Sequence, residues 1–151
     1  MFRGISNLNI DSKGRIAIPT KYRDEIKAER NGEMVLTVDH ADRCLALYPI
    51  SKWEDTEQTL MRLPNLDPDV RMMKRLMQGH ATDVVMDGQG RIMLPPKLRQ
   101  YAVMDKKLVL IGQGDKFEIW DEDAWNDSCD MMVEAAPINI QNNEALRKLS
   151  I

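Results

Sequence analysis

Two arginines follow the same kind of turn at two places in the chain. Residues 11–15 read DSKGR and residues 87–91 read DGQGR, so Arg15 and Arg91 each come directly after an Asp-x-x-Gly stretch. A guanidinium is a planar fork of donors that forms two parallel hydrogen bonds with a guanine edge or a phosphate. Loops held by a rigid scaffold often carry function. The leading candidate chemistry is therefore recognition of base edges or phosphates by these arginines.

The same arginines also have a purely structural interpretation. Each could be a solvated loop residue, or could pair with Asp11 or Asp87 to hold its own turn together, and exposed ion pairs contribute little energy. The repetition of further basic residues behind each turn favours the functional interpretation, and the residues alone leave both open. These repeated residues are Lys21 and Arg23 in the first copy and Lys97 and Arg99 in the second.

No catalytic or metal-binding arrangement is evident elsewhere in the sequence. His40 and His80 stand alone, without the spacing of metal ligands. Cys44 and Cys129 are far apart with no CxxC pair, which argues against a structural zinc site and a disulfide framework. The glycines of GQGR and GQGD complete neither a dinucleotide motif nor a P-loop. The sequence predicts a protein that is not an enzyme and holds no metal or cofactor.

Charge is unevenly distributed along the chain. The net charge is −3, from 21 basic and 24 acidic residues. Residues 1–23 nevertheless hold five basic side chains and one acidic, whereas residues 115–134 hold eight acidic and one basic. One surface can thus bind a polyanion while another keeps the protein in solution. No apolar run approaches the roughly 20 residues of a membrane span, and a secretory signal is not recognisable, so we expect a cytoplasmic protein without membrane contact.

The repeated turn belongs to a duplication that covers most of the chain. Residues 11–23 and 87–99 agree at seven of thirteen positions, where composition alone gives roughly one. The similarity continues from MVLTV to LVLIG and from LALYPISKW to FEIWDEDAW. The predicted organisation is a first repeat with a C-terminal helix at 1–63, a linking helix at 64–79, a second such repeat at 80–136 and a tail at 137–151.

Each repeat is predicted to open with two strands joined by a hairpin or hairpin-like turn. Asp11 and Asp87 can accept hydrogen bonds from nearby amides, and Gly14 and Gly90 can adopt a positive φ without a Cβ penalty. These four residues are therefore the predicted turn formers. The strands beside them are predicted at 5–10, 15–18, 82–86 and 91–94.

A helix, two strands and a second helix are predicted to follow in each repeat. Pro19 and Pro95 pre-set φ for a first helical turn. Ser51 and Glu54 have the spacing of a capping box, and Asp67 is the predicted cap of the linking helix. The predicted elements are 20–28, 34–38, 44–48 and a helix from 51, then 96–102, 107–111, 116–120 and a helix from 121–123.

The repeated stretch resembles a known DNA-binding signature. DSKGRIAIPTKYR and its second copy DGQGRIMLPPKLR are similar to the AbrB/SpoVT-like DNA-binding domains, and the opening MFRG, LALYPISKWE and the GHA before the second copy closely resemble the MraZ family. The resemblance implies a mainly β fold with short helices (α+β). It further implies a duplicated, swapped-hairpin, double-split β-barrel whose two halves form a pseudo-dimer within one chain.

The same resemblance implies a function and a site. It implies a sequence-specific transcriptional regulator at the nucleoid, acting on repeated double-stranded DNA elements upstream of its own division and cell-wall gene cluster. Family members assemble into rings, so a homo-oligomer is expected. Arg15 and Arg91 are the expected base readers or groove-inserted residues. The expected contacts to the DNA backbone are Lys13, Lys21, Arg23, Lys97 and Arg99, with Arg3 at the same basic end.

Two further expectations concern differences within the chain. Lys13 of the first loop is replaced by Gln89 in the second, so the first loop is expected to contribute more phosphate affinity. An alternative function is a protein-interaction module of the antitoxin type, because AbrB-like folds also occur in antitoxins. The acidic stretch at 121–134 and the polar tail after Pro137 would then bind the partner.

Overall fold

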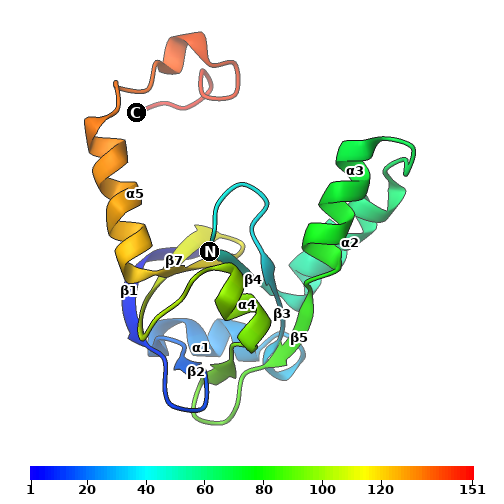
Figure 1. The fold of residues 1–151 in the computed structure, drawn as a ribbon, viewed down its shortest axis with the longest axis vertical. Helices are drawn as coiled ribbons and strands as arrows, with labels where there is room; N and C mark the ends of the chain where they lie inside the picture. The colour runs from blue at the N-terminus through cyan, green and yellow to red at the C-terminus, as the bar shows by residue number, and fades with distance from the viewer.

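The computed structural model describes all residues from 1 to 151 (Figure 1). The elements of the first repeat are β1 (Phe2–Asn9), β2 (Arg15–Ala17), α1 (Thr20–Lys27), β3 (Glu33–Val38), β4 (Leu45–Pro49) and α2 (Ile50–Arg62). Helix α3 (Pro68–Met73) then continues into a π-helical turn (Lys74–Gln78). The second repeat contains β5 (Thr82–Val85), β6 (Arg91–Met93), α4 (Pro96–Tyr101), β7 (Lys107–Gly114), β8 (Phe117–Asp121) and α5 (Glu122–Glu134). The mainly β, α+β composition that we expected is confirmed.

The strands of the two repeats are interleaved in two sheets. The larger sheet has six strands in the order β1-β7-β8-β4-β3-β5, and β2 pairs with β6 in a separate two-stranded sheet. Strand β1 of the first repeat runs antiparallel to β7 of the second, and β5 of the second runs antiparallel to β3 of the first. The first two strands of each repeat therefore lie in different sheets, and the turn between them connects the sheets instead of closing a hairpin.

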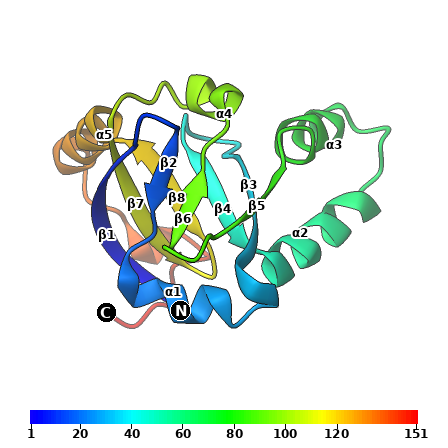
Figure 2. The same ribbon diagram turned by 90° about the horizontal axis from the view of Figure 1, so that it is seen from below.

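The two-stranded sheet lies across one face of the larger sheet. Figure 2 shows β2 and β6 side by side in front of it, with α1 at one end of the pair and α4 at the other. Ile16 of β2 faces Ile92 of β6, and both side chains are buried. Burying an apolar side chain of this size contributes about 1.5–3 kcal/mol. The ribbon thus covers the core and presents its ends at the surface.

Residues from both repeats form a single main core. Phe117 of β8 is fully buried and stacks on Phe2 of β1 with ring centroids 4.2 Å apart. It also contacts Tyr22 of α1 edge-on at 5.0 Å. Such aromatic pairs add about 0.5–1.5 kcal/mol beyond the area that they bury. Neither repeat could retain this core if the other were removed.

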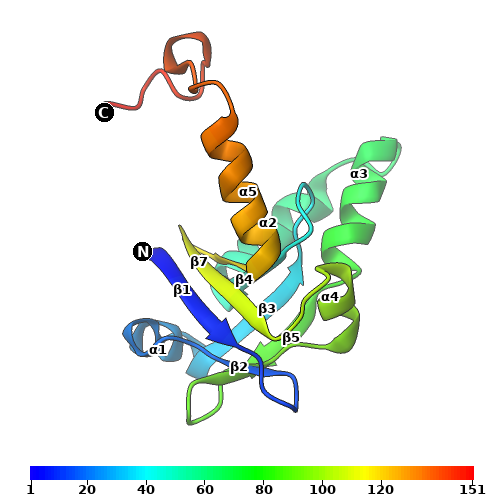
Figure 3. The same cartoon turned by 60° about the vertical axis from the view of Figure 1, so that its left-hand side comes forward.

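Two helical projections extend away from the connecting turns. Figure 3 shows both turns together at one end of the molecule, while α5 with the tail and the α2–α3 pair point toward the opposite side. No residue of α5 is buried. None of the helices is long and apolar enough to span a bilayer.

One predicted helix cap is confirmed and another is wrong. Asp67 caps α3, because its carboxylate accepts a hydrogen bond from the amide of Asp69 at 2.9 Å. The capping box at Ser51 does not form, because α2 begins earlier, after Pro49. The Ser51 amide donates instead to the Glu29 carboxylate at 2.7 Å. The Ser51 amide is therefore bound by Glu29, which is distant in the sequence, and not by Glu54, which the local spacing predicted.

Candidate nucleic-acid interface

The two Asp-x-x-Gly-Arg turns lie at the same end of the molecule. They precede β2 and β6, which run antiparallel, with Arg15 opposite Met93 and Ala17 opposite Arg91. Both turns emerge at the bottom of Figure 1 and again at the bottom of Figure 3. The antiparallel pairing places the two loops at opposite ends of the short β2–β6 pair, and both lie on the side of the molecule that this pair covers. We call the two turns loop 1 (residues 11–15) and loop 2 (residues 87–91).

An aspartate organises each loop through three hydrogen bonds. In loop 1, Oδ1 of Asp11 accepts from the amides of Lys13 and Arg15 at 2.9 Å each. Its Oδ2 accepts from Nε of Arg15 at 2.8 Å. Loop 2 repeats this arrangement around Asp87, with the amides of Gln89 and Arg91 and with Nε of Arg91, all at 2.9 Å. The two loops therefore have the same internal structure.

The glycines of the loops adopt the conformation that the turn requires. Gly14 has φ +82° and Gly90 has φ +77°. A side chain at such a φ is sterically disfavoured. The amide of each glycine also donates to the backbone carbonyl of its aspartate, Asp11 or Asp87, at 3.0 Å. The four predicted turn formers thus lie in the turns in the manner expected.

The pairing of each arginine with its aspartate leaves most of the guanidinium free. The ion pairs use Nε, and no hydrogen bond within the chain uses the Nη groups of Arg15 or Arg91. The side chains are 26% exposed for Arg15 and 32% for Arg91. The structural and the functional interpretation thus apply to the same arginine. Its aspartate orients the side chain through Nε, and the two Nη groups can still bind a planar pair of acceptors.

Hydrogen bonding lowers the pKa of both loop aspartates below the ordinary 3.8. The largest cause is the amide of Arg15 or Arg91, and the guanidinium of the same residue adds a smaller contribution. A pKa lowered by folding means that the ionised carboxylate stabilises the loop above about pH 3.8, and that this stabilisation is lost as the pH falls through the folded-state pKa.

A carboxyl titration is expected to show this effect. Followed by ¹³C NMR, the midpoints of Asp11 and Asp87 should both lie below 3.8. The fraying of the two loops should follow those midpoints as acid is added, because the protonated carboxyl loses its acceptor role for the amides. A midpoint at or above 3.8 in both loops would contradict the hydrogen-bond arrangement.

Two of the expected DNA-backbone contacts are packed beneath the loops. Arg23 of α1 donates from Nε to the carbonyl of Ile18 at 2.7 Å, and a Cβ placed on Gly90 would lie 2.1 Å from that Nε. Arg99 of α4 lies against Gly14, where an added Cβ would be 3.2 Å from Nη2. Each arginine therefore contacts the loop of the other repeat, whereas we expected only a contact with the DNA backbone. Sequence spacing within one repeat gave no signal for these contacts.

The three expected lysines are exposed but differ in position. Lys13 lies at the surface of loop 1, and Lys97 lies at the surface of α4. The ammonium of Lys21 lies 4.9 Å from the ring centroid of Tyr22 and close to Gly4, near the start of β1. Lys13 is therefore the lysine most directly associated with a loop.

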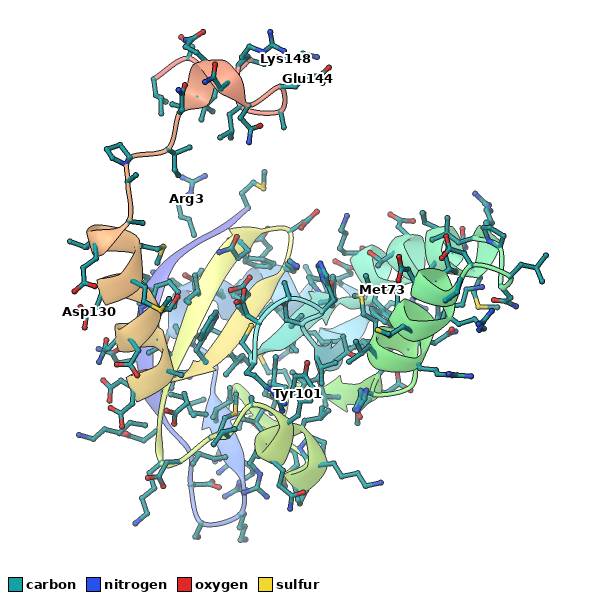
Figure 4. All side chains as sticks on the ribbon, turned by 45° about the horizontal axis from the view of Figure 1, so that its top comes forward. Arg3, Met73, Tyr101, Asp130, Glu144 and Lys148 are labelled. Carbon is teal, nitrogen blue, oxygen red and sulfur yellow. The ribbon has the colours of Figure 1, made fainter.

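Arg3 lies far from loop 1, although both belong to the same basic stretch of the sequence. Arg3 lies near the start of β1, opposite Gln113, and loop 1 follows the far end of the same strand. At about 3.3 Å per residue, an extended strand separates residues 3 and 11 by roughly 25 Å. Figure 4 shows Arg3 on the side of the molecule that faces the tail. Counting charges along the sequence missed this separation because it ignores the length of the strand.

One cluster of potential metal ligands was not evident from the sequence. Ligand atoms of Asp39, Cys44 and Glu118 lie within 4.8 Å of one another. The Asp39 carboxylate already accepts hydrogen bonds from the amides of Ala41 and Asp42. Burial raises the pKa of the Cys44 thiol, with the nearby carboxylates as smaller causes, so this thiol stays protonated. Asp39 thus has a structural role in this turn, because its carboxylate binds two of the turn amides.

Comparison with known proteins follows the same two halves. A family model described as "MraZ protein, putative antitoxin-like" matches residues 1–76 and again residues 77–148. The chain belongs to the MraZ family. This confirms the resemblance seen in the repeated stretch and its flanking residues.

Relatives within the MraZ family match the chain from end to end. The protein named Transcriptional regulator MraZ in Thioalkalivibrio sulfidiphilus (strain HL-EbGR7) is 50% identical over 151 residues, which covers 100% of both chains. Proteins of the same name are 45% identical in Halorhodospira halophila (strain DSM 244 / SL1) and 49% identical in Shewanella sp. (strain W3-18-1), each over 152 residues and 100% of both chains. The name describes a regulator and no enzymatic activity.

Proposed function

We propose that this member of the MraZ family is a sequence-specific DNA-binding transcriptional regulator that contacts DNA through loops 1 and 2. The observation that carries the proposal is the arrangement of two identically built loops at one end of one body, each presenting an arginine fixed by its aspartate. The major groove of B-DNA, roughly 12 Å wide, admits a two-stranded ribbon such as β2–β6. The regulator name of the relatives supports the same function.

Roles within the proposed interface follow from the chemistry of the side chains. Arg15 and Arg91 would read bases, because the free Nη groups suit the paired acceptors of guanine. Lys13, Lys21 and Lys97 are exposed and would bind phosphates as point charges. This assignment leaves specificity with the arginines and affinity with the lysines.

The fold proposed for this function is a swapped-hairpin, double-split β-barrel with an intrachain pseudo-dimer. The pairing of β1 with β7 and of β5 with β3 supports it, because each repeat contributes its first strand to the other. Within it we propose the repeats at 1–63 and 80–136, the linking helix at 64–79 and the tail at 137–151. The boundaries follow the ends of α2, the π-helical turn and α5.

We further propose that several copies assemble, as a ring, on repeated DNA elements upstream of the division and cell-wall gene cluster. The protein would then reside with the nucleoid in the cytoplasm. Exposed apolar side chains gathered on the projecting helices support association between copies, since large exposed apolar patches often mark protein–protein contacts. They include Leu66 and Met72 near α3 and Met131, Met132 and Val133 on α5.

A gel-shift titration against the DNA directly upstream of the gene tests the proposal. At two salt concentrations, we expect steep salt dependence and competition by the specific fragment in preference to unrelated DNA of equal length. A protein that binds neither fragment, or binds both equally, would contradict sequence-specific regulation.

The charge difference between the loops leads to a separate expectation. Lys13→Gln gives loop 1 the residue that loop 2 carries at Gln89. The slope of log affinity against log salt should fall by about one unit, because one phosphate contact is lost. Preference among sequences should be unchanged. Gln89→Lys is the matched reverse variant and should raise the slope, and a slope that stays constant in both variants would remove Lys13 from the interface.

A second candidate function is an antitoxin-type protein-interaction module. The observation that favours it is the acid-rich helix α5, which has no buried residue and is followed by a tail with exposed Ile138 and Leu149. Deleting residues 137–151 separates the two functions. DNA binding should survive the deletion, whereas an interaction made by the tail should be lost.

A further inference from the structure

We propose that Arg23 and Arg99 are positioning residues, each of which holds the DNA-binding loop of the opposite repeat in shape without touching DNA. This inference rests on the proposed DNA-binding role of the loops. The two arginines would then support the loops and would not make the phosphate contacts that their charge alone suggests. The inference concerns how the loops are kept ready for binding, which the sequence of either repeat alone does not reveal.

Each loop is hydrogen-bonded to the opposite repeat. The carbonyl of Gly90 in loop 2 accepts from the amide of Ile18 at 2.8 Å. The carbonyl of Gly14 in loop 1 accepts from the amide of Leu94 at 2.8 Å. Ile18 and Leu94 occupy equivalent positions, three residues after Arg15 and Arg91 respectively. Each loop therefore depends on the backbone that follows the other loop.

Arg23 holds Ile18, the residue to which loop 2 is hydrogen-bonded. Its Nε donates to the carbonyl of Ile18, whose own amide donates to Gly90. The carbonyl of Ile18 is thus bound by Arg23, and the amide of Ile18 is bound by loop 2. The side chain of Ile18 is fully buried, which anchors the segment in the core.

The absence of a side chain at Gly90 leaves room for Arg23. A Cβ on Gly90 would lie 2.1 Å from Nε and 2.6 Å from Cδ of Arg23. The stem of the arginine therefore occupies the space that a side chain at residue 90 would fill. Because Nε is committed to Ile18, Arg23 cannot move aside without losing that hydrogen bond. The contact is a close fit between α1 and loop 2.

Arg99 makes the equivalent contact with loop 1 but holds it less firmly. An added Cβ on Gly14 would lie 3.2 Å from Nη2 and 3.3 Å from Cζ of Arg99, so the approach is looser. Nε of Arg99 is buried and has no hydrogen-bond partner. Loop 1 therefore lacks the bond that Arg23 supplies beneath loop 2. We expect replacing Arg23 to affect its loop more than replacing Arg99.

Amide hydrogen exchange without DNA tests the positioning role directly. In Arg23→Ala, exchange of the Ile18 amide should accelerate by about tenfold or more. The reason is that loss of one hydrogen bond from a charged donor changes an equilibrium by on the order of tenfold. The Leu94 amide should change much less. Arg99→Ala should spare Ile18, and it should change Leu94 less than Arg23→Ala changes Ile18, because Nε of Arg99 has no hydrogen-bond partner. Lys27→Ala, one turn further along the same helix and exposed, is the control and should alter neither. A uniform acceleration of all amides, or none at Ile18, would overturn the inference.

DNA binding supplies a second test that separates positioning from contact. Arg23→Ala should weaken specific binding by about fivefold or more when Arg91 is present, and by much less when Arg91 is already alanine. With Arg15→Ala as the background, the loss should persist in full. The salt slope should not change. A slope reduced by about one unit, with equal losses in both backgrounds, would identify Arg23 as a phosphate contact and overturn the inference.

The conservative variant completes the comparison. Arg23→Lys retains the positive charge but has no Nε donor for the Ile18 carbonyl. It should therefore behave like the alanine variant in exchange at Ile18, whereas a phosphate contact would be largely retained. If wild-type protein bound no DNA, the proposed function would fail while the exchange result would still decide whether Arg23 positions loop 2.

Discussion

Replacing Arg15 or Arg91 by alanine is expected to weaken binding to the specific DNA by roughly 1–3 kcal/mol for each arginine. The reason is that each side chain presents unused Nη donors while its Nε is held by Asp11 or Asp87. Preference for the specific sequence over unrelated DNA should fall with the affinity. Quantitative gel shifts with specific and unrelated fragments at one fixed salt concentration measure both quantities.

Two further variants identify the cause of such a loss. Arg15→Lys keeps the charge but lacks the planar fork, so it should retain the salt dependence and lose discrimination between sequences. Arg62→Ala removes an exposed arginine at the end of α2, away from both loops, and should bind as the wild type does. Wild-type affinity in both Arg15→Ala and Arg91→Ala would show that the loops are not the interface.

The second large effect is expected in the core that the repeats share. Phe117→Ala should lower the free energy of unfolding by about 3–5 kcal/mol, the usual cost of removing a buried phenyl ring. Phe117 has 0% exposure and packs on Phe2 and Tyr22, both of which belong to the first repeat. Urea denaturation followed by circular dichroism and by tryptophan fluorescence gives the free energy.

The same experiment reports whether the two repeats unfold together. Trp53 lies in α2 of the first repeat and Trp120 in β8 of the second, so single-tryptophan variants monitor each repeat separately. Both probes should give one coincident transition in wild-type protein and in Phe117→Ala. Phe117→Leu, which retains most of the buried volume, should cost much less. Separate transitions for the two probes would contradict a common core.

The parts of the molecule that sequence predicts well are those decided by local chemistry. Asp11 and Gly14 form their turn with the hydrogen bonds and the positive φ that an Asp-x-x-Gly stretch favours. Pro19 and Pro95 precede helices that begin where expected, because a fixed φ acts on the neighbouring residues alone. The candidate base readers Arg15 and Arg91 rest on the repetition of the same short local pattern, and their role in binding DNA stays a prediction.

The parts that sequence did not predict depend on contacts between distant segments. Arg23 lies against Gly90 because β2 pairs with β6, and no spacing within one repeat encodes that pairing. Ser51 has an acceptor at the right local distance, but its amide is bound by Glu29 instead. Arg3 was grouped with the loops by charge alone, although the length of β1 separates it from loop 1. In each case the contacts depend on how the strands pair, and residue spacing along the sequence does not encode that pairing.

The exchange of strands between the repeats also sets the order in which the chain can fold during synthesis. Strand β1 is made first but pairs with β7, and β2 waits for β6, so the first repeat leaves the ribosome with open strand edges. Pairings between segments so distant in sequence raise the contact order, which slows folding. Until the last strands emerge, the nascent first repeat has the exposed edges that make partly made chains prone to aggregate. The architecture that unites the two loops thus delays their formation until nearly the whole chain has been translated.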